Sequence, residues 1–274
     1  MKRSYKKFWF VLCWMFLVFL LYSSVLYSKL YRIVSLTPSI TESLYMLGEK
    51  ENVVGITTFC RRVSYKQRVI GTYLEPNIEE IVRLNPDFVF ISKEGTRKEI
   101  VENLERFKLK VVVFDPTNSF EDIKKQFLSI ASFVGKKSVA QKIIKDYENK
   151  LLSFRRKSSK KVLCVLGLQP LIVASERSYI GEIIRFAGGE NIVKSEIKYP
   201  QMNIEQIIKL GPEVILLSDM GVEEKEIRKF FSQYNDIPAV KNNKIFVLES
   251  DVLCQPTIKN FYILVEKMYW ILNE

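Results

Sequence analysis

The sequence contains no histidine among its 274 residues. Exported proteins that bind bare zinc or manganese usually build the site from several imidazoles and carboxylates, so a free transition metal and a histidine-ligated haem are both disfavoured. The chain also has no G-x-G-x-x-G after a strand, no P-loop and no nucleophile elbow. A two-lobed enzyme that uses carboxylates or a cysteine is therefore a weaker interpretation than a binding protein. We expect no catalytic residue, no cofactor and no metal site.

Cysteine is also scarce. Of the four cysteines, Cys13 lies in an apolar run near the N-terminus, and the other three are Cys60, Cys164 and Cys254. An odd number cannot form a complete disulfide framework. Cys164 lies in KVLCVLG and reads as a small apolar residue of a buried strand. Cys60 and Cys254 fall in loops and could face each other across a binding cleft.

Acidic residues are fewer than basic ones: 42 Lys and Arg stand against 31 Asp and Glu. Without the four cations of the first seven residues, the excess is +7. These charges are spread along the chain, and no basic stripe alternates with aromatic residues, so we expect no nucleic acid as a partner. A lysine-rich solvated surface is the simplest interpretation. Adsorption to an anionic membrane is the alternative.

The N-terminus has the three-part plan of a secretory signal. Residues 1–7 carry four cations, residues 8–22 are apolar and uncharged, and serines follow at 23, 24 and 28. We therefore predict a signal peptide at 1–28. Residues 8–27 are also long enough to span a membrane and could stay attached as an anchor. Either way, the rest of the chain is expected to work outside the cytoplasm, and a membrane-tethered sensor is a weaker alternative to a binding protein.

One stretch is written twice. NIEEIVRLNPDFVFIS at 77–92 returns as NIEQIIKLGPEVILLS at 203–218, a spacing too long for a solenoid repeat. In each copy an asparagine caps a helix, and Glu80 or Gln206 closes a capping box. A residue that tolerates a left-handed conformation and a proline then end the helix and begin a strand. The repeat therefore indicates two similar halves.

Strands alternate with helices on both sides of a helical middle segment, which predicts two α/β lobes, each with a mostly parallel sheet flanked by helices. The expected boundaries are 29–118 for the N-terminal lobe, 119–157 for the connector and 158–274 for the C-terminal lobe. Within the connector, one long rigid helix is expected to run from after Gly135 to about Lys157 and to limit movement of the lobes. A capping box of Ser39 and Glu42 is expected to begin the first helix.

Each copy of the doubled stretch contains one glutamate that is not required to form its helix. Glu79 and Glu205 occupy the second helical position, where the helix dipole alone favours an acid. Because the two copies lie in two matched lobes, the carboxylates could also form a recognition key for a two-fold symmetric partner.

Several motifs together resemble the solute-binding proteins of ABC importers whose lobes are joined by a long helix, a group that carries cobalamin, ferric siderophores and haem. The resemblance is strongest to the cobalamin-binding proteins and covers residues 31–274. It rests on RIVSLTPSITESLYMLG, the pair PNIEEI and MNIEQI, AGGENIV and IPAVKNNKIFVLESDVL. It implies a monomer that receives a metal chelate and docks on a permease dimer through Glu79 and Glu205. It also implies a location in the periplasm or at the outer face of the cytoplasmic membrane.

Ligands of open parallel sheets gather at the carboxyl ends of strands. The loops expected there offer aromatic rings for a large flat ligand and polar groups for its edges. By resemblance, Phe59, Tyr73 and Tyr199 correspond to corrin-contacting aromatics, and Asp251 to an acidic ligand contact. The predicted ligand-binding residues are Thr37, Pro38, Phe59, Cys60, Tyr73, Gln169, Tyr199 and Asp251.

The sequence departs from the family at two places. CQPTIKN stands where an R-P-G-P-R-like segment is common, and Arg61 replaces a common acidic residue. Four cations are expected near the cleft, so an anionic ferric siderophore, or haem, is the alternative to a corrinoid. These cations are Arg61, Arg62, Lys93 and Lys198.

Overall fold

The N-terminal lobe is built on a five-stranded parallel sheet in the order β3-β2-β1-β4-β5. The computed structural model describes residues 31–154, 158–219 and 224–273, so the predicted signal at 1–28 lies outside the described residues. The central strands are fully buried, as expected when helices cover both faces of a sheet. The strands are β1 (Ile33–Ser35), β2 (Val53–Ile56), β3 (Arg68–Val69), β4 (Phe88–Ser92) and β5 (Val111–Phe114).

Three helices of this lobe connect its strands: α2 (Pro38–Met46), α3 (Ile78–Arg83) and α4 (Lys98–Arg106). The predicted capping box of Ser39 and Glu42 is wrong. The N-cap is Thr37, its side chain makes no cap bond, and Pro38 begins the helix. The fixed backbone angle of proline suits the first helical position, so the helix starts before Ser39.

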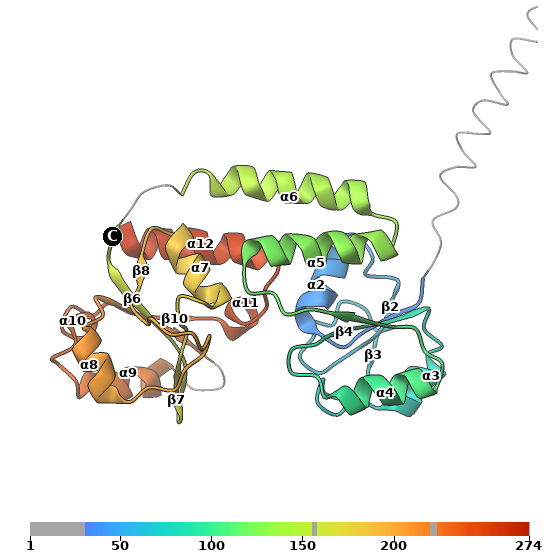
Figure 1. Cartoon of the computed structure of the whole chain (residues 1–274), viewed down its shortest axis with the longest axis horizontal. Coiled ribbons are helices and arrows are strands. Elements are labelled where there is room, and N and C mark those ends of the chain that lie inside the picture. Colours follow the sequence, from blue (N-terminus) through green and yellow to red (C-terminus); the bar gives the residue numbers. More distant parts are fainter. Residues whose placement is uncertain (1–30, 155–157, 220–223, 274) are drawn as a thin grey trace, which may run out of the picture.

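The connector is a helical hairpin of α5 (Phe120–Phe133) and α6 (Lys137–Leu151), which Figure 1 shows lying along the top of both lobes. Gly135, with a φ of 70°, makes the sharp turn between them. The 15 residues of α6 correspond to about 22 Å of helix. This helix ends at Leu151, so it is shorter than the predicted helix to about Lys157, and its partner α5 shares the span.

The C-terminal lobe has a second five-stranded sheet, ordered β10-β9-β6-β7, with β8 also paired to β6. Only β7 runs antiparallel to its neighbour. The strands are β6 (Lys161–Leu168), β7 (Leu171–Val173), β8 (Glu190–Asn191), β9 (Val214–Ser218) and β10 (Ile245–Leu248). The helices are α7 (Tyr179–Phe186), α8 (Ile204–Leu210), α9 (Glu224–Ser232), α10 (Pro238–Lys241), α11 (Ser250–Leu253) and α12 (Ile258–Asn273). The predicted α/β class with two mostly parallel sheets is confirmed.

The largest apolar cluster runs through both lobes. It joins one face of each sheet to α5, α6 and α12, with Phe90, Phe127 and Phe261 among its fully buried rings. The opposite faces of the two sheets have separate clusters, one in each lobe. The lobes are therefore fused along the connector side and independent on the other. None of the helices in the described ranges combines the length and the apolar character that a membrane span requires.

The doubled stretch forms α3 and α8, as predicted. Asn77 Oδ1 accepts from the Glu80 amide at 2.9 Å, and Asn203 Oδ1 accepts from the Gln206 amide at 2.9 Å. Only α8 completes the capping box, because Gln206 also accepts from the Asn203 amide. In α3, Glu80 instead lies 3.6 Å from an Arg83 nitrogen. The two helices thus occupy corresponding positions in the two lobes but differ in the hydrogen bonds of their N-terminal caps.

Candidate functional site

The first predicted site residues, Thr37 and Pro38, follow β1. Thr37 Oγ1 accepts a hydrogen bond from the Ser92 amide at 2.9 Å, which ties the end of β1 to the end of β4. Pro38 is half-buried at the start of α2. The Thr37 hydroxyl therefore fixes the relative position of two strand ends.

Cys60 belongs to the interior of the N-terminal lobe. Its side chain is 7% exposed, and Sγ lies 3.2 Å from both Thr41 Oγ1 and Thr57 Oγ1. Cys254 is exposed in the C-terminal lobe, and both cysteines are free. Although the residue as a whole is exposed, desolvation of its sulfur atom raises the pKa of the Cys254 thiol. The contact between Cys60 and Cys254 that the sequence left open is therefore not formed, and Cys254 stays protonated at neutral pH.

Phe59 and Tyr73 form an aromatic pair in the N-terminal lobe. Phe59 is 59% exposed, and the ring centroids lie 6.0 Å apart with the planes inclined at 57°. Tyr73 packs on Gly95, where a Cβ atom would lie only 3.1 Å from its ring. Gly95 also has a φ of 76°, which disfavours a side chain. Loops after β2, β3 and β4 thus combine to present the exposed ring of Phe59 beside the half-buried ring of Tyr73.

Tyr199 of the C-terminal lobe lies near enough to Glu94 of the N-terminal lobe for the two groups to interact electrostatically. It is 39% exposed. Burial of its phenol, and then the carboxylate of Glu94, raise the pKa of Tyr199. Glu94 directly precedes Gly95, so loops of both lobes approach each other here. We call the surface formed by Phe59, Tyr73, Glu94 and Tyr199 the inter-lobe site.

The other two predicted residues of the C-terminal lobe lie at its surface. Gln169 is exposed in the turn between β6 and β7, and Asp251 is exposed on α11. Both follow the carboxyl ends of strands, as predicted. Among the described residues, neither forms a hydrogen bond or ion pair with the inter-lobe site.

Sequence reasoning missed a buried hydroxyl beneath Tyr199. Tyr179 is 3% exposed, and its hydroxyl has no hydrogen-bond partner among the described residues. Burial, followed by the proximity of Tyr199 and Cys254, raises the pKa of Tyr179. As the first residue of α7, Tyr179 follows the helix-capping Ser178 and gave no signal beyond its apolar character.

The four cations expected near the cleft are already engaged. Arg61 forms a bidentate ion pair with Glu42 at 2.8 and 2.9 Å. The Arg62 guanidinium donates to the carbonyl oxygens of residues 64 and 65, and Lys93 Nζ lies 3.7 Å from Asp115 Oδ1. Lys198 Nζ donates to Asn118 Oδ1. An anionic ligand would have to compete with these contacts.

Glu79 and Glu205 occupy the second positions of α3 and α8 and are exposed. Neither forms an ion pair or a side-chain hydrogen bond with any residue that the structure describes. Figure 1 places α3 and α8 at the outer ends of the two lobes, on the side away from α6. The two helices that carry these unpartnered carboxylates therefore lie on one side of the molecule (Figure 1).

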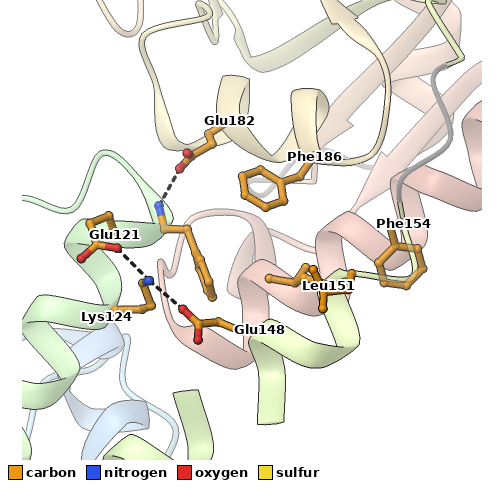
Figure 2. A pocket seen from close by; sticks show the side chains of 9 residues that line it. Glu121, Lys124, Glu148, Leu151, Phe154, Glu182 and Phe186 are labelled. Atoms are coloured by element: carbon orange, nitrogen blue, oxygen red, sulfur yellow. Dashed lines mark hydrogen bonds and ion pairs between the residues drawn. The ribbon is translucent and has the colours of Figure 1, made fainter. Parts of the chain in front are cut away.

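A hollow of about 580 Å³ lies on the connector side. As Figure 2 shows, Lys124 contacts Glu121 and Glu148, each at 2.7 Å, and the Glu182 carboxylate accepts from the backbone amide of Phe120 at 2.5 Å. Burial opposes the charge of Lys124, but the two carboxylates raise its pKa. These charged groups are paired with one another, and the hollow lies at the junction of α5, α6 and α7. We therefore assign it a structural role.

The carboxylates, cysteines and other donor groups do not assemble into a metal site. No group of three or more metal-binding side chains occurs in the described part of the chain. What the inter-lobe site presents is aromatic surface with tyrosine hydroxyl groups and the single carboxylate of Glu94.

Comparison with known proteins places these features in a family. A family model described as "Periplasmic binding protein" matches residues 33–252. The vitamin B12-binding protein of Vibrio parahaemolyticus is 26% identical over 243 residues, covering 86% of this chain and 87% of that protein. The haem uptake protein IsdE of Staphylococcus aureus is 29% identical over 238 residues, covering 80% and 79%.

Solved structures share the fold. The haem-binding protein HutB of Vibrio cholerae superposes with a TM-score of 0.80 at 20% identity, covering 90% of this chain and all of that one. An ABC transporter substrate-binding protein of Listeria monocytogenes gives a TM-score of 0.72 at 22% identity, covering 89% and 98%.

Proposed function

The chain belongs to the periplasmic binding protein family, and on that premise we propose that it captures a corrinoid, most simply cobalamin, outside the cytoplasm. It would then deliver this ligand to an ABC importer. The family members that it resembles are binding proteins of transport systems of the cobalamin, haem and siderophore type, and they are not enzymes.

The observation that carries the proposal is the aromatic character of the inter-lobe site. Phe59 is exposed and pairs with the half-buried Tyr73 in one lobe, and Tyr199 supplies a partly exposed ring in the other. A corrin or other large flat chelate buries much apolar area against such rings, while a few polar groups fix its orientation. Because its metal is already chelated, it needs no histidine from the protein.

The engaged cations argue against a strongly anionic ligand. Arg61 is neutralised by Glu42, and Lys93 and Lys198 have oxygen partners of their own. A ferric siderophore carrying several negative charges would gain full attraction only by breaking these contacts. Corrinoids have a peripheral set of amides, which bind by hydrogen bonds instead.

Haem is the second candidate. It is favoured by the 29% identity to a haem uptake protein and by the phenol of Tyr73, which stands beside the open ring of Phe59. A tyrosine oxygen can ligate haem iron where histidine is absent. Haem binding would therefore require the hydroxyl group of Tyr73, whereas corrinoid binding would not.

Absorbance titrations of the purified protein with cobalamin, cobinamide, haemin and a ferric hydroxamate test the proposal. We expect cobalamin or cobinamide to bind. Phe59→Ala should weaken binding at least about tenfold, because a large aromatic contact is removed, and Tyr73→Phe should change it little. Haemin binding that Tyr73→Phe abolishes, with no corrinoid binding, would instead establish the haem function.

Docking on the importer is a separate part of the proposal. We propose that Glu79 and Glu205 each meet a basic group of one permease subunit. Reversal of both charges, Glu79→Arg with Glu205→Arg, should abolish ligand uptake by cells but leave ligand affinity unchanged. Glu99→Arg with Glu226→Arg, which alters exposed acids of α4 and α9, is the matched control. Unchanged uptake in the Glu79 and Glu205 variant would refute the docking role.

A further inference from the structure

The loop that leads into β3 combines cations with exposed apolar side chains. Residues 62–69 read RVSYKQRV, with three cations and no acid. Tyr65 is 83% exposed, and Val63 and Val69 are 38% and 46% exposed. We call residues 62–69 the basic loop.

The basic loop is held in one shape by a buried polar side chain. Gln67 is 0% exposed, and its Oε1 accepts from the amides of Val63 and Ser64 at 2.9 and 3.2 Å. Its Nε2 donates to the Tyr45 hydroxyl at 3.0 Å and to the Lys50 carbonyl oxygen at 3.2 Å. The exposed side chains of the loop are therefore displayed by a fixed scaffold.

The positive charge of the basic loop is not neutralised from within the described residues. Arg61, just before it, is paired with Glu42, but Arg62 contacts only carbonyl oxygens through its guanidinium. Neither Lys66 nor Arg68 forms an ion pair in the parts of the chain that the structure describes. Lys66 and Arg68 thus remain available to an anionic surface, and Arg62, although its guanidinium donates to carbonyl oxygens, keeps a charge that no carboxylate neutralises among the described residues.

The basic loop adjoins the predicted docking helix of its lobe. A hollow of about 420 Å³ is lined by Arg62, Gln67 and Arg68 on one side and by Asn77 and Glu80 of α3 on the other. Figure 1 shows β3 and α3 on the same side of the molecule, away from α6. If Glu79 docks on a permease embedded in the membrane, the basic loop faces the lipid surface around that permease.

We propose that the basic loop binds anionic phospholipid headgroups beside the importer, an inference that rests on the docking role proposed above. Each cation near an anionic leaflet contributes attraction, and tyrosine favours the boundary between water and lipid. The two small exposed valines add apolar contact at that boundary. The lipid contact would orient the N-terminal lobe before Glu79 meets its partner.

Hydroxyl-radical footprinting of the purified chain with mass spectrometry tests the proposal, because it reports on single side chains. Vesicles of phosphatidylcholine with phosphatidylglycerol should protect Tyr65 from oxidation, and pure phosphatidylcholine vesicles should not. Trp270, which is 60% exposed on α12, serves as the internal reference and should stay unprotected. Added salt should reduce the protection, since exposed charges are screened.

The variant Arg62→Gln, Lys66→Gln, Arg68→Gln should weaken binding to the anionic vesicles roughly a hundredfold, as expected for three surface cations. Lys137→Gln, Lys142→Gln, Lys145→Gln removes equal charge from α6 and should leave the protection of Tyr65 intact. Equal protection by both vesicle types, or none, would overturn the proposal. So would protection that appears only when vesicles contain the importer, because the loop would then recognise protein.

The comparison of anionic with pure phosphatidylcholine vesicles uses neither ligand nor importer. A failure of corrinoid binding or of the docking role therefore leaves its outcome unaffected, and the two sets of hypotheses can be tested separately.

Discussion

The hydroxyl of Tyr45 lies at the centre of the network that supports the basic loop. It donates to the Arg61 carbonyl oxygen and accepts from Gln67 Nε2, both at 3.0 Å. Burial, only partly offset by the bond from Gln67, raises the pKa of Tyr45 to about 12. The phenol is therefore neutral in the folded protein at every pH below that value.

This pKa predicts a loss of stability in strong alkali. The unfolded chain releases the Tyr45 proton near the ordinary tyrosine pKa of 10.0, whereas the raised pKa of the folded chain holds it to about 12. The stabilisation is complete below pH 10 and disappears as the pH rises through 12. We expect Tyr45→Phe to flatten the fall in the free energy of unfolding across this range, measured by urea denaturation. Tyr65→Phe is the control, because Tyr65 is 83% exposed, and an equal slope in all three proteins would contradict the assignment.

Among the polar side chains of this lobe, Gln67 is the one whose removal should lower the free energy of unfolding most. Gln67→Ala leaves the amides of Val63 and Ser64 without their acceptor, and the Tyr45 hydroxyl without a donor. We expect the free energy of unfolding to fall by about 3 kcal/mol, since several buried groups become unsatisfied. Gln233→Ala, at an exposed position, should change it by less than about 0.5 kcal/mol. Denaturation of both variants gives the comparison.

At the scale of elements, the start of α5 is inserted into the C-terminal lobe. Phe120 is 6% exposed, and its ring lies 4.5 Å from that of Phe261 at an angle of 29°. Its amide donates to Glu182, which also pairs with Arg185 at 3.0 Å. The first turn of the connector is therefore fixed to the lobe that follows it in sequence.

Phe120→Ala should destabilise the protein by about 3–5 kcal/mol, because it removes a buried aromatic side chain and leaves a cavity. Phe107→Ala, at a position that is 55% exposed, is the matched control and should have a small effect. Thermal unfolding of the two variants can be compared directly. Similar losses in both would show that Phe120 does not anchor the connector.

The helices and strands were predicted correctly where residues close in sequence determine them. The period-two and helical patterns, the asparagine caps and the prolines located α3, α8 and the strands after them. The boundary of α2 was wrong because proline at the first helical position outweighed a serine cap. Both helices of the connector were predicted, but the end of α6 was placed too late, because helix boundaries are poorly marked where no glycine or proline ends the helix.

The candidate site could be predicted only in part. Strand order and turn chemistry placed Phe59, Tyr73 and Tyr199 at strand ends, and the aromatic pair formed. The pairing of Arg61 with Glu42 and the burial of Cys60 depend on contacts 19 residues apart in sequence. The unpartnered hydroxyl of Tyr179 depends on packing between segments of the C-terminal lobe. No single-sequence pattern encodes such contacts.

At the scale of the whole molecule, the shared core predicts little movement between the lobes. The largest apolar cluster continues from the N-terminal sheet through α5 and α6 to α12. Lys136 Nζ also lies 3.8 Å from Glu49, a buried carboxylate of the N-terminal lobe, and holds the connector turn. Domain closure would disrupt this packing, since interiors are close-packed.

We therefore expect the radius of gyration from X-ray scattering to change little when a saturating corrinoid is added. Phe120→Ala should permit a larger change if the anchor of α5 restrains the lobes. A large decrease in radius for the unaltered protein would contradict this expectation and indicate a hinge in the connector.

The position of α12 also bears on the moment at which the protein can fold. This helix is formed by residues 258–273 and packs against α5, α6 and α7. Until the end of the chain has been synthesised, the inner faces of these three helices have no cover and expose buried-type side chains. A nascent or truncated chain would then expose apolar surface that chaperones and proteases recognise. α12 therefore has to be in place before the connector helices can bury their apolar faces completely.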